Sequence, residues 1–194
     1  MNHKKLTLVL VLVILVAGFL GAQQPPETYK IGDIGPAGGI VFYDKGSVSD
    51  GWRYLEAAPS NTEFIAEWGL YDYDLAGTGT AIGSGRENTR FIVERLNARG
   101  ESNRAAQGCV ALNINGYTDW FLPSKDELNL MYSKIRKHPR GGFNTTEDTN
   151  NKHWYWSSSQ YFRADYAWAQ RFSDSTHDYR AKHLTFSVRA VRAF

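Results

Sequence analysis

Cysteine is almost absent from this sequence of 194 residues, since Cys109 is the only one. The chain therefore cannot form an intramolecular disulfide bond, and its fold must be held by an apolar core. Aromatic residues make up 14% of the chain, and each one can bury a large apolar area. We expect a core rich in aromatic side chains, with Cys109 buried as a small apolar residue and not as a reactive thiol.

A strong net charge is also absent. The chain has 22 Lys and Arg against 20 Asp and Glu, and loss of Lys4 and Lys5 with an N-terminal leader leaves it formally neutral. The overall charge therefore gives no indication of nucleic-acid binding, and we expect none. Basic residues exceed acidic ones in the C-terminal part, residues 111–194, which favours an anionic partner there. An ordinary solvated surface explains the same excess equally well.

Long apolar runs are missing from the chain except at its N-terminus. Lys4 and Lys5 precede an apolar run from Leu6 to Leu20, and Gly21-Ala22 follows it. This layout is typical of a secretory signal peptide, here residues 1–22, because the run is shorter than the about 20 residues of a membrane-spanning helix. We expect cleavage near Ala22 and export to the periplasm, the cell surface or the medium, with no membrane span afterwards. The alternative is an uncleaved N-terminal anchor.

The remaining chain is predicted to form a short linker, residues 23–30, and one domain, residues 31–194. Apolar alternation predicts strands at 40–43 and 52–59. Helical spacing predicts two helices, at 86–100 and from Ser124 onward. The last forty residues alternate as strands in "HWYWSSSQY", "DYAWAQRFS" and "KHLTFSVRAVRAF", joined by polar links. We therefore predict an α+β fold with a mainly antiparallel sheet, a C-terminal β-meander, and a core that contains Trp154, Trp156 and Trp168.

The segment "NGYTDWFLPSKDELNLMY", residues 115–132, combines a serine with several acidic side chains and raises the question of catalysis. Ser124 and Glu127 have the S-x-x-E spacing of a helix capping box. Asp126 and Glu127 also favour the positive N-terminal end of a helix. No histidine stands nearby in the sequence to activate Ser124. We interpret the segment as scaffold.

Cofactor motifs are weak. The "GTGTAIG" stretch lacks the lysine and the strand-to-helix context of a phosphate-binding loop. Asp72 and Asp74 alternate along the chain, but the segment lacks the ligand number of a calcium loop. We therefore expect no cofactor and no metal.

Four blocks in order carry a family resemblance: "GYTDWFLPSKDEL", "YWSSSQY", "AWAQRFS" and "VRAVRAF". Together with "IGDIGPAGGIVFYDKG" and "GWRYLEAAP" they resemble the bacterial exported domains named after the C-terminal domain of the Legionella collagen-like protein. The resemblance covers about residues 31–194. It implies a C-type lectin-like fold and a surface-exposed binding or adhesion module, in the best-known case associated with sulfated glycans.

The chain departs from that family in two ways. Members often carry a second cysteine near the terminal V-R-x-V-R, where this chain has Ala190, so the pair that Cys109 would join is lost. The calcium-binding signatures of sugar-binding C-type lectins are also absent, and "WSSS" stands in the region of one of them. We therefore expect recognition without calcium.

In lectin-like folds the recognition surface lies on the loops between the C-terminal strands. Aromatic rings can stack on a ligand, and Arg offers a planar fork for sulfate or carboxylate. On this basis the candidate ligand-binding residues are Tyr161, Arg163, His177, Tyr179, Arg180 and Lys182. The expected partner is an anionic glycan or a host or matrix protein, and self-association into a homo-oligomer is compatible with the sequence.

Enzymatic function is the weaker interpretation, and we expect a protein that is not an enzyme. A formylglycine-generating oxygenase, a more distant relative of the fold, needs a pair of cysteines. A glycoside hydrolase needs two carboxylates about 5–10 Å apart, for which the sequence offers Glu63, Glu67, Asp72 and Asp74 without a distinguishing spacing. A structural envelope protein that binds another protein is the remaining alternative.

Overall fold

The computed structural model describes residues 28–147 and 150–194. The predicted signal peptide and residues 23–27 of the predicted linker lie outside this range. Tyr29, within that predicted linker, packs its ring against Tyr54 and Phe194 with ring centroids 5.4 and 5.3 Å apart. Residues just before position 31 therefore contribute to the folded unit.

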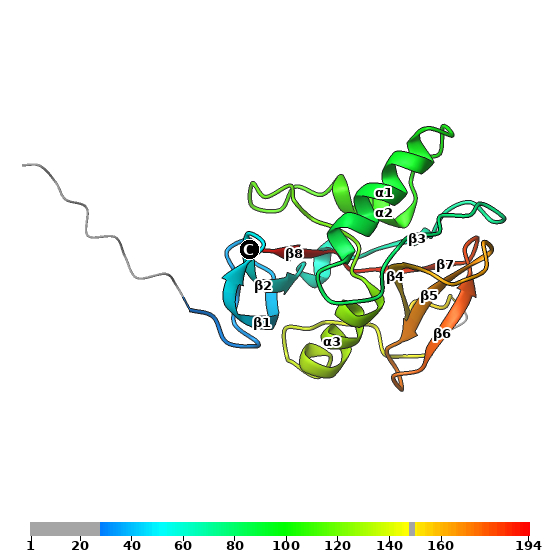
Figure 1. Cartoon of the computed structure of the whole chain (residues 1–194). Coiled ribbons are helices and arrows are strands. Elements are labelled where there is room, and N and C mark those ends of the chain that lie inside the picture. Colours follow the sequence, from blue (N-terminus) through cyan, green and yellow to red (C-terminus); the bar gives the residue numbers. More distant parts are fainter. Residues whose placement is uncertain (1–27, 148–149) are drawn as a thin grey trace, which may run out of the picture.

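The strands form two sheets (Figure 1). A three-stranded sheet has the order β1-β2-β8, and a five-stranded sheet has the order β3-β7-β4-β5-β6. Their bounds are β1 Ile40–Ser49, β2 Trp52–Ala57, β3 Phe64–Glu67, β4 Trp154–Gln160, β5 Tyr166–Arg171, β6 His177–Ala181, β7 Thr185–Val188 and β8 Val191–Ala193. Every strand pairing is antiparallel except that between β4 and β7. The predicted α+β fold with mainly antiparallel pairing is confirmed.

The C-terminal strands differ from the predicted meander. The link expected to be a polar loop contains strand β6, which pairs with β5 over its whole length. The next strand, β7, does not continue at that edge; it crosses to the far side of β4 and runs parallel to it. The meander prediction is therefore right for β4 and β5, misses β6, and is wrong for the last strand, which divides into β7 in this sheet and β8 in the small sheet. Strand β3, which pairs with β7, was not predicted.

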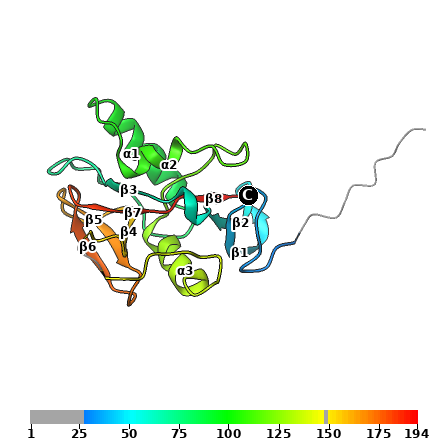
Figure 2. The same ribbon diagram turned by 180° about the vertical axis from the view of Figure 1, so that it is seen from behind.

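Helices lie on both sides of the five-stranded sheet (Figures 1 and 2). Three α-helices are present among the described residues, against two predicted: α1 Gly85–Asn97, α2 Ala105–Val110 and α3 Lys125–Ile135. A short 3-10 helix, η1, spans Ser60–Thr62. The sequence did not identify α2 because six residues are too few to show a helical period. Helix α2 and α1 lie on one side of the sheet, and α3 lies on the other.

The capping box of α3 forms as predicted. The Glu127 backbone N–H donates to Ser124 Oγ at 3.3 Å, and the Ser124 N–H donates to Glu127 Oε2 at 2.7 Å. Glu127 Oε1 also accepts from the Gly83 N–H at 2.8 Å, so this carboxylate joins the starts of α1 and α3. Ser124 Oγ donates to the Ala81 carbonyl at 2.9 Å, which completes its structural role. Burial is the main cause that raises the pKa of Glu127.

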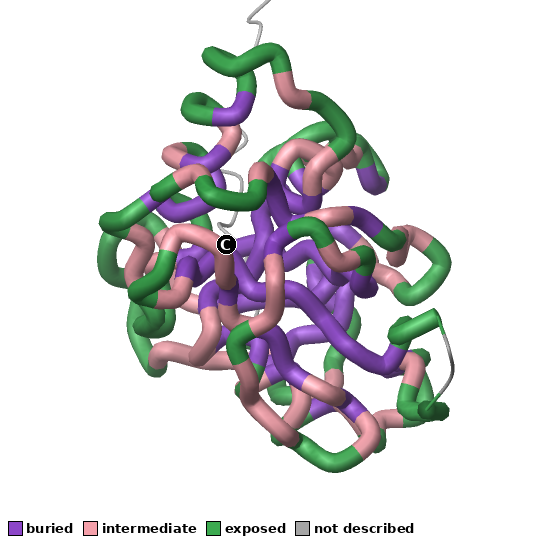
Figure 3. Tube along the Cα trace, turned by 90° about the vertical axis from the view of Figure 1, so that its right-hand side faces the viewer, coloured by how far each residue is buried: buried purple, intermediate pink, exposed green. Residues whose placement is uncertain are grey.

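The apolar interior consists of two clusters, one on each face of the large sheet. The first packs Trp154, Trp156 and Phe186 against α1 and α2, and it contains the fully buried Cys109. The second packs Tyr155 and Phe172 against α3 and the small sheet. Figure 3 shows the buried parts of the chain running through the centre, with exposed loops around them. The predicted aromatic core is confirmed for Trp154 and Trp156, and the predicted burial of Cys109 is also confirmed.

Arg189, in the link between β7 and β8, and Arg192 of β8 bind carboxylates of the same domain. Arg189, which is 1% exposed, donates to Glu63 Oε2 at 2.6 and 3.0 Å. Arg192 donates to Glu56 Oε1 at 2.9 Å and to Asp119 Oδ1 at 2.5 Å. Because a buried charge is costly without a partner, these pairs fix how the C-terminal strands dock on the rest of the domain.

Candidate functional site

Five aromatic side chains gather at the end of the large sheet, on β5, β6 and the turn between β4 and β5. Register explains the arrangement: Trp168 on β5 lies opposite Tyr179 on β6, so both side chains point to the same face. Tyr166 shares that face, because side chains two residues apart in a strand point the same way. We call the five residues the aromatic surface: Tyr161, Phe162, Tyr166, Trp168 and Tyr179.

The rings of the aromatic surface contact one another. Tyr161 stacks on Tyr179 with ring centroids 4.3 Å apart and an angle of 13° between the planes. Trp168 meets Tyr161 edge to face at 5.1 Å, and Phe162 lies 4.3 Å from Tyr161. These contacts hold the rings in place, yet 82% of Phe162 and 43% of Tyr179 remain exposed. The protein thus presents an ordered apolar surface to solvent.

Cationic side chains lie at two edges of this surface. The Arg163 guanidinium lies 5.0 Å from the centre of the Tyr166 ring and 3.1 Å from the Asp165 carboxylate. Lys125, at the start of α3, places its Nζ 5.0 Å from the centre of the Trp168 ring. A cation over an aromatic face is attracted by the ring quadrupole, so both groups are held beside the rings.

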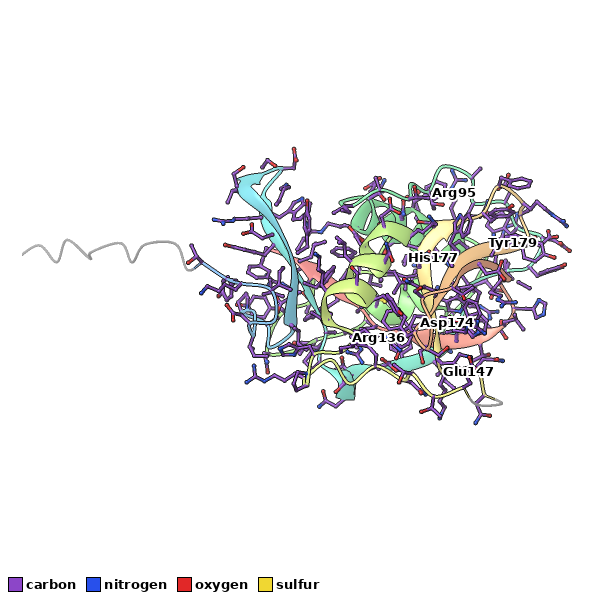
Figure 4. The ribbon with its side chains drawn as sticks, turned by 90° about the horizontal axis from the view of Figure 1, so that it is seen from below. Arg95, Arg136, Glu147, Asp174, His177 and Tyr179 are labelled. Atoms are coloured by element: carbon purple, nitrogen blue, oxygen red, sulfur yellow. The ribbon has the colours of Figure 1, made fainter. Side chains whose placement is uncertain are left out.

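The side of the aromatic surface nearest to α3 is polar. His177 Nε2 lies 3.1 Å from Asn129 Oδ1, and Gln170 Nε2 donates to the same oxygen at 3.2 Å. Burial, followed by the nearby Lys125 charge, lowers the pKa of His177. His177 is therefore held neutral to lower pH than a free histidine, with one ring nitrogen engaged by Asn129. In Figure 4, Tyr179 lies at the end of the molecule remote from the β1–β2 hairpin, and His177 lies nearer to α3.

A groove of about 280 Å³ borders the aromatic surface. One wall is formed by Gln160, Tyr161 and Phe162, and the other by the loop segment 76–78. Its volume is near the lower end of the range for pockets that hold a small ligand. The aromatic surface and the groove share Tyr161 and Phe162, so they form one continuous candidate site.

Four of the six predicted ligand-binding residues lie at or beside this site: Tyr161, Arg163, His177 and Tyr179. Arg180 does not, because it alternates with Tyr179 along β6 and points to the opposite face of the sheet. There its guanidinium lies 4.1 Å from the centre of the Trp154 ring and pairs with Asp178 at 3.3 Å. The prediction that Arg180 shares a surface with Tyr179 is wrong.

Lys182 is the second correction, since the exposed loop position predicted for it is also wrong. The residue is 0% exposed. Its Nζ donates to the Tyr73 carbonyl at 2.8 Å and to Gln160 Oε1 at 2.6 Å. The hydrogen-bond partners that compensate for its burial lie far away in the sequence, so the residues around Lys182 could not predict that it is buried.

The sequence interpretation missed Tyr166 and Lys125 as members of the site, and it placed Trp168 in the core. Trp168 is only partly buried and belongs to the aromatic surface, so that core prediction is wrong. The alternation Tyr166, Trp168, Gln170 could have indicated one shared face, but composition alone does not show that nothing covers it. Trp154 and Trp156 are buried as predicted.

The described residues contain no group of three or more His, Cys, Asp or Glu side chains that could hold a metal ion. Of the carboxylates considered for hydrolysis, Glu63 is bound to Arg189 and Glu67 to Arg104. Burial, together with a hydrogen bond to Asp165, raises the pKa of Asp72. Asp74 accepts from Gln160 Nε2 at 2.7 Å. Each of these carboxylates is thus engaged within the protein.

Comparison with known proteins confirms the family that the sequence resembles. No curated protein matches the chain. The family model of the Lcl C-terminal domain, which is the C-terminal domain of the Legionella collagen-like protein, matches residues 75–192. This range is more than half of the chain, and it includes α1, α2, α3 and the whole candidate site. The chain belongs to the Lcl C-terminal domain family.

Proposed function

We propose that this protein is an exported binding module that recognises glycans through the aromatic surface and its groove. The observation that carries the proposal is the stacked pair Tyr161 and Tyr179 with the largely exposed Phe162 beside it. A soluble domain rarely exposes adjoining aromatic rings unless they meet a partner. Pyranose rings have apolar faces that suit such a surface, and the groove gives room for a single substituent or ring.

The ligand proposed for this surface is acidic or sulfated. Lys125 and Arg163 lie at its edges, where either could meet an anionic group while the sugar ring rests on the aromatic side chains. Arg163 is 56% exposed, so Asp165 does not enclose its guanidinium. Exposed charges of this kind are screened by salt, and binding should weaken as ionic strength rises.

Recognition is proposed to proceed without calcium and without catalysis. The first point rests on the sequence, which lacks the calcium-binding signatures of sugar-binding C-type lectins. Of the carboxylates considered for hydrolysis, Glu63 and Glu67 are bound to Arg189 and Arg104. This supports the second point. The lectin-like character of the fold remains part of the same proposal.

The proposed location is outside the cytoplasm. The N-terminal sequence supports export, and no helix in the described part of the chain is long and apolar enough to cross a membrane. The periplasm, the cell surface and the medium are all compatible with this proposal.

The test is a glycan array probed with residues 23–194 at two salt concentrations, with calcium and with a chelator. We expect binding to acidic or sulfated glycans that falls with salt and persists with chelator. Phe162→Ala should reduce the signal at least tenfold. Val48→Ala is the matched control, because Val48 is also an apolar side chain with 73% exposure but belongs to the β1–β2 hairpin. Equal loss in both variants would contradict the assignment of the site.

A second candidate function is binding to another protein as a structural envelope component. The 82% exposure of Phe162 favours it, because large exposed apolar side chains often mark protein interfaces. Two results together would replace the glycan proposal with this one. The folded protein would bind nothing on the array, and a protein partner would retain the wild type but not Phe162→Ala.

A further inference from the structure

A buried polar cluster lies beneath the loop that forms one wall of the groove. Lys182 is at its centre and is fully buried. Besides its hydrogen bonds to the Tyr73 carbonyl and Gln160 Oε1, its Nζ lies 4.7 Å from the centre of the Trp68 ring. A lysine is almost never fully buried unless its ammonium group has partners, and here three groups surround it.

Gln160 links this lysine to the loop at several points. Its Oε1 accepts from the Leu75 N–H at 2.7 Å as well as from Lys182. Its Nε2 donates to Asp74 Oδ1 at 2.7 Å, and its backbone N–H donates to Thr78 Oγ1 at 2.8 Å. One side chain and one backbone amide therefore contact the loop at residues 74, 75 and 78.

The same residues border the groove. Gln160 is the last residue of β4 and immediately precedes Tyr161, and both line the groove opposite segment 76–78. Leu75 is 2% exposed and anchors the loop in the core, whereas Ala76 and Gly77 are exposed. Gly77 has φ +110°, a conformation that favours glycine and leaves no side chain in the groove wall at that point.

We propose that Lys182 and Gln160 form a buried clamp that holds the loop 73–78 at the distance from Tyr161 that ligand binding requires. Lys182 is then a positioning residue, which acts on the ligand through the loop and never contacts it. This inference rests on the proposed function for its effect on affinity, but its effect on the loop does not depend on any ligand.

The decisive variant is Lys182→Met, which keeps the apolar stem and removes the donors. It leaves the Tyr73 carbonyl without its donor, while Gln160 Oε1 retains the Leu75 N–H. Hydrogen exchange of the backbone amides should accelerate at least tenfold within residues 73–78 and stay unchanged in α3. Affinity for a sulfated tetrasaccharide should fall about tenfold. Lys134→Met is the matched control, because it makes the same chemical change at an exposed position of α3.

Each result has a defined meaning. Unchanged exchange in residues 73–78 of Lys182→Met would overturn the clamp, whatever the glycan data show. Faster exchange with unchanged affinity would overturn its role in positioning the groove. Absence of tetrasaccharide binding by the wild-type protein would count against the proposed function and leave the exchange test of the clamp intact. If Lys182→Met does not fold, Asp74→Ala tests the same cluster at its exposed end. Hydrogen exchange in residues 75–78 is expected to be faster in this variant as well.

Discussion

The two faces of the five-stranded sheet carry similar aromatic side chains but differ in what covers them. On one face, α1 and α2 enclose Trp154 and Trp156, and the Trp156 indole N–H donates to the Ala66 carbonyl at 3.0 Å. On the other face, α3 packs against β4 and β5, and the rings of Trp168 and Tyr179 remain partly uncovered. The difference shows that alternating aromatic residues predict which side chains share a face of the sheet, whereas the extent of the covering helix determines whether that face is buried or exposed.

Truncation of a tryptophan should separate the two faces most strongly. Trp156→Ala removes a fully buried ring and should lower the free energy of unfolding by about 3–5 kcal/mol, as large core truncations do. Trp168→Ala removes a partly exposed ring and should cost about 1 kcal/mol. Urea denaturation of both variants measures the difference. Equal losses would contradict the distinction between the covered and the uncovered face.

Charge removal at the edges of the aromatic surface should have the next largest effect. Lys125→Gln combined with Arg163→Gln should weaken binding of a sulfated tetrasaccharide about tenfold at low salt, or about 1.4 kcal/mol, and less at high salt. Isothermal titration at two salt concentrations provides the measurement. If the loss were the same at both salt concentrations, the two side chains would not act through their charge.

Arg180→Gln should leave that affinity within about twofold of the wild type. The side chain lies on the covered face beside Trp154, so it cannot meet a ligand that occupies the aromatic surface. The same titration compares it directly with the double variant. A loss as large as that caused by Arg163→Gln would place the ligand on the other face of β6.

A separate expected effect is a pH dependence of stability that comes from the buried lysine. Burial lowers the pKa of Lys182 from 10.5 to about 8, against the opposing effect of the Asp74 and Asp165 carboxylates. Between about pH 8 and 10.5 the unfolded chain binds more protons at this residue than the folded protein does, so its contribution to stability rises with pH. Below pH 8 it is protonated in both states and the contribution is constant.

The unfolding free energy of the wild type minus that of Lys182→Met should therefore increase between pH 8 and 10. Denaturation of both proteins is measured across this range. The two proteins share all other titrating groups, so the difference between their unfolding free energies removes the effects of those groups. A difference that stays flat would show that the lysine keeps its proton in the folded protein throughout the range.

The sequence was sufficient to predict those structural features that depend on contacts between neighbouring residues. The Ser124 capping box, the helix that follows it and the strand alternation of β4 and β5 all follow from contacts within a few positions. Strand β6 was missed because polar side chains alternate on both of its faces, as is common for an edge strand that must avoid pairing with other chains. Its pattern therefore resembled that of a loop.

The errors at the site have a common physical cause in long-range contacts. Lys182 is buried because Trp68, Tyr73 and Gln160 supply its partners, and none of them is near it in the sequence. Trp168 is partly exposed because α3 does not cover the end of the sheet. Neither fact can be derived from local composition, although the residue types at Tyr161, Arg163, His177 and Tyr179 did indicate the region in which the aromatic surface lies.

The central claim is that the uncovered aromatic surface is where a ligand binds. Nuclear magnetic resonance of ¹⁵N-labelled residues 23–194, titrated with the sulfated tetrasaccharide, tests it most directly. The account predicts that the largest shift changes fall on the Trp168 indole N–H and on the backbone amides of residues 161–163 and 177–179, with little change in α1. Saturable shifts centred on α1 or on the β1–β2 hairpin, with the Trp168 signal unmoved, would contradict it.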